Sequence, residues 1–360
     1  MTEDASSPAA PDPKRRRDRR QGLLLLLLAG ILTAAAMILI VWNQLTPSSA
    51  GLSTPTEFEV LPGWDANRTA AALSEAGLIR NARLFSLYLR LRDLDTRIGE
   101  GLYNLDPAMS AAEIAAALVA GGRPRTTRVV LPEGLRAGEV AARLAAAGLG
   151  ELTDFLARIA EPNELRPQYL PPDSGLEGFL FPASYDIPTA STPDEILNLL
   201  TQRFAQVISS DVTEALSASG LTVHDWVTLG SIVQAEAGST DEMPVIAGVF
   251  LNRLEIGMAL QSDPTVAYGL NKGLPELDAS AGDFEQDHPW NTYTRGGLPA
   301  GPIGNPGAEA LMAVLAPQRE NPDGRPYLYF IHGFDGGGPI FRPNISLADH
   351  NRDIGRYLRP

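Results

Sequence analysis

The chain has 360 residues, of which 44% are hydrophobic, and its formal net charge is −14. This length predicts a globular protein of two or three domains. The absence of cysteine excludes disulfides, cysteine nucleophiles and thiolate metal sites. The acidic balance argues against a nucleic-acid partner.

A basic tail and an apolar stretch open the chain. Residues 1–21 form a polar tail with the run KRRRDRR over 14–20, and the segment Gly22 to Trp42 carries no charge. A helix of 21 residues is about 31 Å long, which matches the hydrocarbon core of a bilayer. We expect one transmembrane helix over 22–42 rather than a cleaved signal peptide, because the apolar run is long and lacks a clear small-residue exit. The basic tail predicts a cytoplasmic N-terminus, a single pass through the cell (inner) membrane and an extracytoplasmic remainder.

A weak internal duplication follows a Ser/Thr/Pro-rich linker over 43–56. VLPGWDANRTAAALSEAGL, from Val60, resembles VLPEGLRAGEVAARLAAAGL, from Val130, and YNLDPAMSAAEIAAAL aligns with YDIPTASTPDEILNLL. Each copy has a short strand, a Pro/Gly turn and an amphipathic helix. We expect two related α+β units over 57–123 and 124–205, the first of them LysM-like. The second unit has a Pro/Gly-rich insertion containing LEGFLFP. The alternative is a chance alignment of alanine-rich helices.

The composition changes again beyond the second unit, which predicts a further domain over 206–360. TVHDWVTLGSIVQAEAG and DEMPVIAGVFLNRLEIG have the pattern of two helices, and GAEALMAVLAP that of a third. Between them, MALQSDPTVAYGL and HPWNTYTRGGLPAGPIGNPG are predicted to be loops. PYLYFIHG and GPIFRP, joined by a Gly-rich turn, are predicted to form a hairpin.

The sequence lacks the residues that several classes of enzyme require for catalysis. There is no Gly-x-Ser-x-Gly motif, and the two lysines, Lys14 and Lys272, do not form a Ser-x-x-Lys site. None of the four histidines is paired at metal-ligand spacing, so we expect neither a metal nor a cofactor. Catalysis by carboxylate side chains is the chemistry that these exclusions leave.

One carboxylate continues an apolar helix stripe. Trp226, Leu229, Ile232 and Val233 recur at helical spacing, and Glu236 is next on the same face. Burial would raise the pKa of this carboxyl, which suits a general acid near neutral pH. The alternative is a structural Glu at a helix end, half-exposed or capping a neighbour.

Polar residues downstream point to a saccharide. Amide and hydroxyl side chains beside aromatic rings are typical of sugar sites, and a buried acid among them indicates glycoside cleavage. The candidate substrate-binding residues are Gln261, Ser262, Asp263, Asn291 and Tyr293. Asn305 is a sixth candidate, or a turn residue.

Six ordered motifs carry a family resemblance. LEGFLFPASYDIP, GSIVQAEAG, VFLNRLEIGMALQSDPTVAYG, NTYTRGGLPAGPIGNPG, YLYF and LADHN together resemble the YceG-like endolytic murein transglycosylases, the MltG family. The resemblance implies an α+β fold in which a membrane anchor and LysM-like module precede a mixed α+β catalytic domain. It also implies cleavage of nascent peptidoglycan strands between N-acetylmuramic acid (MurNAc) and N-acetylglucosamine (GlcNAc). That cleavage leaves 1,6-anhydro ends and limits strand elongation.

The resemblance implies Glu236 as the catalytic acid. The family motif has an earlier acidic position, which is Gln234 here, and FPAS has Ala183 where the family often has Asp. We expect Asp263 and Glu177 to orient substrate or support loops rather than to serve as a second acid. The implied partners are peptidoglycan glycan strands and, by analogy, peptidoglycan polymerases or penicillin-binding proteins. The alternatives are a non-catalytic wall-binding or division scaffold and a hydrolytic muramidase.

Overall fold

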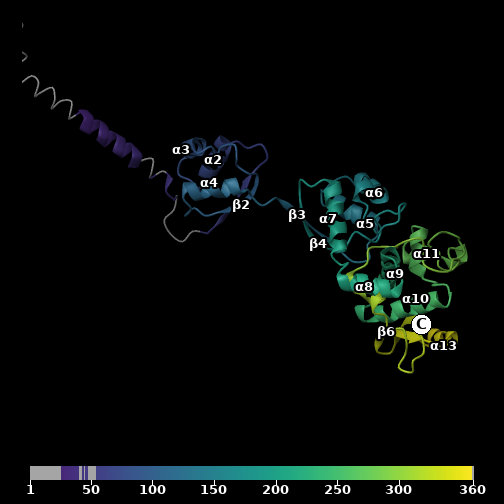
Figure 1. The fold of residues 1–360 in the computed structure, drawn as a ribbon. Coiled ribbons are helices and arrows are strands. Elements are labelled where there is room, and N and C mark those ends of the chain that lie inside the picture. The colour runs from purple at the N-terminus through teal and green to yellow at the C-terminus, as the bar shows by residue number, and fades with distance from the viewer. Residues whose placement is uncertain (1–25, 40–42, 44, 48–53, 359–360) are drawn as a thin grey trace, which may run out of the picture. The chain divides into compact units, whose positions relative to one another are not determined.

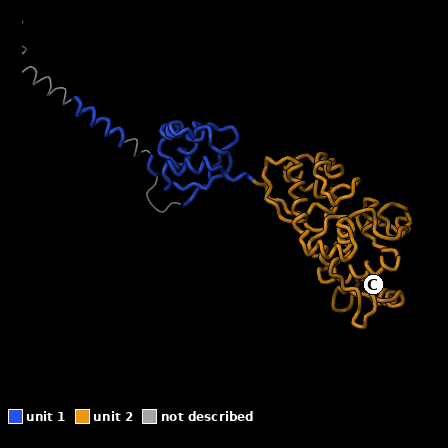
Figure 2. Tube along the Cα trace, in the orientation of Figure 1, with its two compact units in different colours: residues 1–125 blue, residues 126–360 orange. Residues whose placement is uncertain are grey.

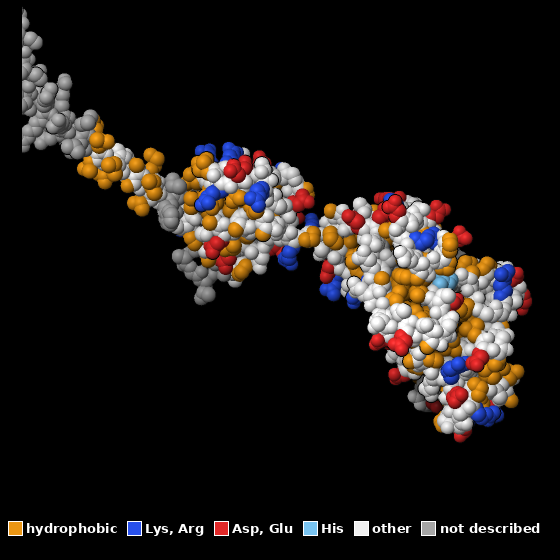
Figure 3. Space-filling model, in the orientation of Figure 1, with side chains coloured by type: hydrophobic (Ala, Val, Ile, Leu, Met, Phe, Trp, Pro, Cys, Tyr) orange, Lys and Arg blue, Asp and Glu red, His pale blue; other side chains and the backbone are white. Residues whose placement is uncertain are grey.

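The computed structural model describes residues 26–39, 43, 45–47 and 54–358. The predicted cytoplasmic tail, together with positions 22–25 and 40–42 of the predicted span, lies outside the described residues. Residues 26–39 are helical and expose apolar side chains (Figure 3). Within the part of the chain that is described, no helix is both long and apolar enough to cross a membrane.

The chain divides into two compact units, one up to Arg125 and one from Thr126 (Figure 2). From residue 54 onward, the first unit contains two strands and three helices: β1 (Thr56–Val60), α2 (Ala66–Glu75), α3 (Ala82–Leu91), β2 (Gly101–Leu105) and α4 (Ala111–Ala120). The strands pair antiparallel, and the helices bury their apolar faces in a core of their own.

The second unit opens with the same order of elements. These are β3 (Thr126–Leu131), α5 (Ala137–Ala146), α6 (Leu152–Ala160), β4 (Ala183–Pro188) and α7 (Pro193–Ala205). Strands β3 and β4 also pair antiparallel.

Two details recur at matching positions of this repeated order. The hydroxyls of Tyr103 and Tyr185 each donate to the carbonyl four residues earlier. A capping box starts the last helix of each copy, Ser110 with Glu113 in α4 and a Thr–Glu pair in α7. The aligned sequence blocks therefore adopt corresponding structures.

The remainder of the second unit is mainly helical (Figure 1). It contains α8 (Ser210–Ser219), α9 (Val223–Glu236), α10 (Met243–Glu255), α11 (Asp263–Gly269), α12 (Ala308–Leu315), β5 (Tyr329–Asp335), β6 (Gly338–Asn344) and α13 (Leu347–Tyr357). Strands β5 and β6 form the predicted hairpin.

Helix α9 is the centre of this part. It packs against α10, α11 and α12. Trp226 donates from its indole nitrogen to the Leu311 carbonyl at 2.7 Å. A Cβ at Gly230 would lie 2.9 Å from the Leu311 side chain, so the glycine allows α9 and α12 to approach closely. One hydrophobic core extends from β3 to α12 and thus lies on both sides of residue 205, where the sequence predicted a domain boundary.

The loop prediction for MALQSDPTVAYGL is wrong in its second half, which forms α11. Pro264 lies in the first helical turn, where a missing N–H costs no hydrogen bond. Thr265, Val266 and Ala267 are buried, so tertiary packing stabilises a helix too short to be indicated by periodicity.

Candidate active site

Helix α9 places Glu236 at the edge of a cavity. Thr222 and Asp225 form a capping box at the start of the helix, and Glu236 is its last residue. The apolar stripe before it is buried, whereas Glu236 itself is half-buried. The sequence left two interpretations of Glu236, an acid on the apolar stripe and a structural residue at the helix end. Each describes part of this arrangement, because the carboxyl continues the stripe and also lies at the helix end.

The cavity has a volume of about 590 Å³ and mixes carboxyl, amide, aromatic and aliphatic side chains. It is lined by Ala235, Glu236, Phe250, Arg253, Leu260, Gln261, Asp263, Pro264, Leu274, Tyr293, Tyr329, Phe330, Leu347 and His350. Among these described lining residues, only Glu236 and Asp263 carry carboxylates.

Ser262 fixes the orientation of the Glu236 carboxyl. Its hydroxyl donates to Oε1 of Glu236 at 2.6 Å, and its own side chain is buried. The Ser262 backbone N–H donates to the hydroxyl of Thr292 at 3.0 Å, and Gln261 N–H donates to the Thr292 carbonyl at 3.1 Å. Two loops that are distant in sequence thus hold the serine against the acid.

The environment raises the pKa of Glu236 to about 7. Burial is the main cause, because it disfavours the charged form. The Ser262 hydrogen bond opposes this rise, the negative charge of Asp263 adds to it, and the positive charges of His332 and Arg253 oppose it. A carboxyl with such a pKa exchanges a proton readily near neutral pH.

Asp263 and Tyr293 form a second polar pair on the cavity wall. Asp263 is exposed at the start of α11, and the Tyr293 hydroxyl donates to its Oδ1 at 2.5 Å. Gln261 is exposed beside them in a left-handed backbone conformation (φ 49°). The structure thus brings Gln261, Ser262, Asp263 and Tyr293 together around Glu236.

Asn291 and Asn305 do not line this cavity. The Asn291 amide donates to the carbonyls of Phe284 and Gln286, at 2.9 and 2.7 Å, and its carbonyl accepts from the Tyr293 N–H at 2.8 Å. Asn305 accepts from Leu180 N–H and donates to the Leu135 carbonyl, both at 2.8 Å. Both side chains are buried and connect loop backbones.

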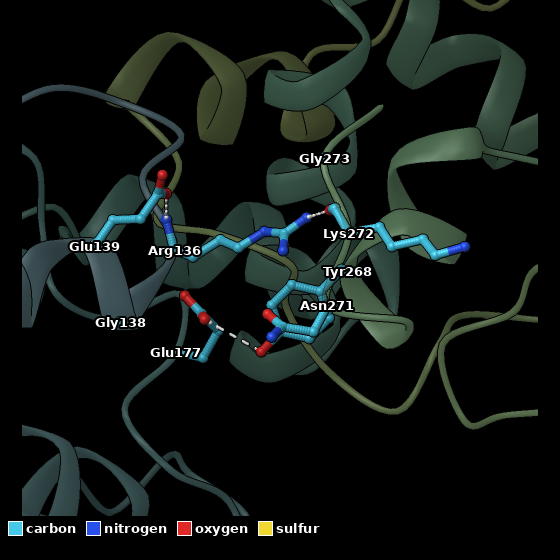
Figure 4. Close-up of a pocket in the computed structure, with 8 residues that line it drawn as sticks. All are labelled: Arg136, Gly138, Glu139, Glu177, Tyr268, Asn271, Lys272 and Gly273. Carbon is cyan, nitrogen blue, oxygen red and sulfur yellow. Dashed lines mark hydrogen bonds between the residues drawn. The ribbon is translucent and has the colours of Figure 1, made fainter. Parts of the chain in front are cut away.

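Glu177 lies in a second cavity, of about 700 Å³, that is also lined by Arg136, Tyr268 and Lys272 (Figure 4). Its carboxylate accepts from the Ala137 N–H at the start of α5, at 2.9 Å, and from the Tyr268 hydroxyl at 3.1 Å. Burial raises the pKa of Glu177 to about 7. The structure therefore separates Glu177 from the cavity of Glu236.

Sequence reasoning missed the far wall of the Glu236 cavity. Arg253 comes from α10, Tyr329 and Phe330 from β5, and Leu347 and His350 from α13. The motifs VFLNRLEIG, YLYF and LADHN contain all five residues, but no residue pattern indicated that they line one cavity with Glu236. Of the five, only His350 could be considered from the sequence as a residue acting singly, and an isolated histidine is more often structural. Within the described residues, no group of three or more His, Asp or Glu side chains is arranged to hold a metal ion.

The fold and site define a mixed α+β protein in which the near-neutral carboxyl of Glu236 lines an aromatic and polar cavity. The model of the YceG-like family matches residues 58–356, and the chain therefore belongs to the YceG-like family.

Two named relatives are similar along most of this chain. The endolytic murein transglycosylase of Streptococcus pneumoniae serotype 2, strain D39, is 26% identical over 345 residues, which cover 88% of this chain and 61% of the relative. The chain thus spans less than two thirds of that relative's length. The endolytic murein transglycosylase of Bacillus subtilis, strain 168, is 27% identical over 331 residues, which cover 87% of this chain and 88% of the relative.

A solved structure has a similar fold. The crystal structure of a YceG-like protein from Listeria monocytogenes superposes with a TM-score of 0.53 at 28% identity. The superposition covers 84% of this chain and 99% of the other.

Proposed function

We propose that this chain is an endolytic peptidoglycan lytic transglycosylase that cleaves the MurNAc–GlcNAc bond of nascent glycan strands and so limits their elongation. The observation that carries this proposal is the half-buried Glu236 carboxyl, with a pKa of about 7, on the wall of a polar and aromatic cavity. The similarity to the pneumococcal and Bacillus endolytic murein transglycosylases supports the same activity.

A single carboxyl performs both proton transfers in this reaction. Protonated Glu236 donates its proton to the glycosidic oxygen as the bond from that oxygen to the muramic C1 breaks. The resulting carboxylate then removes the proton of the muramic C6 hydroxyl, whose oxygen forms a bond to C1. The products are a free GlcNAc hydroxyl and a 1,6-anhydro end. Glu236 regains its proton and no water is consumed, and a pKa near 7 suits both steps.

The surrounding residues have two roles in this proposal. Gln261, Asp263 and Tyr293 face the cavity and contact the sugar, while Ser262 orients the acid. Asn291 and Asn305 act indirectly, because their hydrogen bonds fix the loops on which the cavity wall and the Glu177 cavity are built.

A hydrolytic muramidase is the second candidate, and the carboxylate of Asp263 in the same cavity favours it. A hydrolase uses a second carboxylate to activate water or to form a covalent intermediate. Asp263 already accepts a hydrogen bond from Tyr293, which favours an orienting role instead.

Digestion of purified peptidoglycan separates the candidates. The full chain in detergent is incubated with glycan strands, and the new ends are identified by mass spectrometry. Anhydro ends are the expected result. Ordinary reducing ends would establish the muramidase, and no release of fragments would favour a non-catalytic wall-binding or division scaffold.

The location of the enzyme belongs to the same proposal. Residues 22–42 anchor the chain in the cell membrane with the N-terminus in the cytoplasm, which positions the Glu236 cavity where new strands emerge from their polymerases. Protease added outside spheroplasts should then degrade the chain beyond residue 43. Protection of that region would contradict the topology.

The first compact unit is proposed to be a LysM-like module that binds glycan. Its β–α–α–β–α order and separate core support an independent module. Deletion of residues 57–123 from the anchored chain should weaken its sedimentation with insoluble peptidoglycan. Unchanged sedimentation would indicate that the module serves as a spacer.

A further inference from the structure

Arg253 is a buried cation without a counter-ion. Its side chain is on α10, is 7% exposed and lines the Glu236 cavity. The Nε donates to the Leu328 carbonyl at 2.7 Å and the Nη1 to the Leu260 carbonyl at 2.6 Å. No described residue accepts a hydrogen bond from Nη2, and no ion pair between described residues includes Arg253.

An unpaired buried guanidinium is costly, because water no longer solvates its charge. Exposed arginines of this chain do find carboxylates, as Arg158 does with Asp194 and Arg295 with Asp287. Glu236 does not neutralise Arg253 directly, since no oxygen of its carboxyl lies within 4.0 Å of the guanidinium. The cavity therefore presents a guanidinium that forms no ion pair with a described residue, although its charge acts on Glu236 from a distance.

His350 provides a second, independent unpaired group. Its Nδ1 is buried without a hydrogen-bond partner among the described residues, and the side chain lines the same cavity. The imidazole stacks on Tyr329 with ring centroids 5.2 Å apart, and the Arg253 guanidinium carbon lies 5.2 Å from the centre of that ring. Tyr329 thus holds both groups in place. A neutral imidazole donates a hydrogen bond from the ring nitrogen that carries its proton.

We propose that Arg253 and His350 form a subsite for a carboxylate of the substrate, next to Glu236. This inference rests on the proposed function. Peptidoglycan offers such a group from two sources, the lactyl side chain of a muramic acid without a peptide and the peptide stem of a muramic acid that carries one. Arginine is suited to carboxylate recognition because its planar guanidinium donates several hydrogen bonds in fixed directions. The subsite orients the muramic residue so that its C1 lies at the Glu236 carboxyl.

Two matched pairs of substrates test this subsite. The first pair is glycan strands that bear stems and the same strands with every carboxylate converted to a primary amide. The second pair is strands stripped of stems, which expose the lactyl carboxylate, and their amidated form. The rate at which new ends form is measured as kcat/KM for the full chain in detergent. In at least one pair, amidation should lower kcat/KM about tenfold or more, as the loss of a charge-assisted hydrogen bond predicts. The pair in which amidation lowers kcat/KM identifies whether the bound carboxylate belongs to the peptide stem or to the lactyl group.

Variants then assign the effect to the residues. Arg253→Gln should abolish the preference for the acid form, and His350→Phe should reduce it. Arg253→Lys should retain part of the preference. The Phe variant preserves the stack on Tyr329. Because the preference is a ratio within one protein preparation, partial misfolding lowers both rates and leaves the ratio unchanged.

Arg136→Gln is the matched control. Arg136 also donates to a backbone carbonyl, that of Lys272, and lies over a tyrosine ring, but it lines the Glu177 cavity. This variant should retain the wild-type preference.

The proposal is wrong if amidation has no effect in either pair, or if Arg253→Gln retains the full preference. Anhydro ends from amidated strands would then leave the proposed function intact. No cleavage of any of the four substrates would overturn the proposed function and the subsite together.

Discussion

The hydroxyl of Ser262 donates a 2.6 Å hydrogen bond to Oε1 of Glu236, from a loop that lies 26 residues further along the chain. Ser262 is buried, and its backbone is held by Thr292. The acid at the end of α9 is therefore oriented by loops that belong to no helix or strand, and the pH dependence of the enzyme should respond to them.

Ser262→Ala should move the alkaline limit of activity to higher pH. A general acid is active while protonated, and the Ser262 hydrogen bond lowers the pKa of Glu236. Its removal should therefore raise that pKa. The measurement is kcat/KM for anhydro-end release across pH. A limit that moves to lower pH would contradict this role.

Asp263→Asn should have the opposite effect. The negative charge of Asp263 raises the pKa of Glu236, so the neutral amide should shift the alkaline limit to lower pH. Because Asp263 is exposed, added salt should weaken its influence and reduce the difference between variant and wild type. The same pH series at low and high ionic strength measures both effects. Coincident profiles would show that the charge of Asp263 does not act on Glu236.

Asn305→Ala should destabilise the fold. The buried Asn305 side chain accepts from Leu180 N–H, which its loss leaves unpaired, and it also donates to the Leu135 carbonyl and to Glu177. The expected loss is about 2–3 kcal/mol in the free energy of unfolding, measured with urea. Asn198→Ala, at an exposed position of α7, is the control and should change stability by less than about 0.5 kcal/mol. Equal effects would show that the Asn305 contacts are not made.

Glu177→Gln should flatten the dependence of stability on pH. The pKa of Glu177 is about 7 in the fold against an ordinary value of 4.5, so the folded state binds more protons between these values. The stability that this proton uptake contributes is fully present below about pH 4.5 and is lost as the pH rises to about 7. Unfolding curves of wild type and variant across that range measure the slope. Identical slopes would place the Glu177 carboxyl in a water-like environment.

The catalytic candidate was accessible from the sequence because its signal is local. Helical spacing placed Glu236 on an apolar stripe, and the structure buries that stripe and leaves the acid at its end. The roles of Asn291 and Asn305 could not be inferred in the same way. A polar residue in a loop either faces a ligand or bonds to a neighbouring backbone, and only the long-range packing decides between the two.

The position of Arg253 and His350 in the Glu236 cavity was missed for a related reason. Arg253 lies near the end of an apolar helix, where a charged residue ordinarily faces water, and His350 lies on a helix that the sequence pattern did not indicate. Their shared contact with Tyr329 joins α10, β5 and α13, which no short-range pattern connects. Helix α11 escaped prediction because Pro264 and Gly269 resemble loop residues when tertiary burial is unknown.

The assignment of Glu236 as the acid is tested most directly by Glu236→Gln. The amide preserves the shape of the side chain and can still accept from Ser262, but it cannot donate a proton as an acid does. We predict that anhydro-end release from purified peptidoglycan, measured by mass spectrometry, falls by about a thousandfold or more while the variant remains folded. Wild-type release of anhydro ends by the folded Glu236→Gln variant would contradict the mechanism.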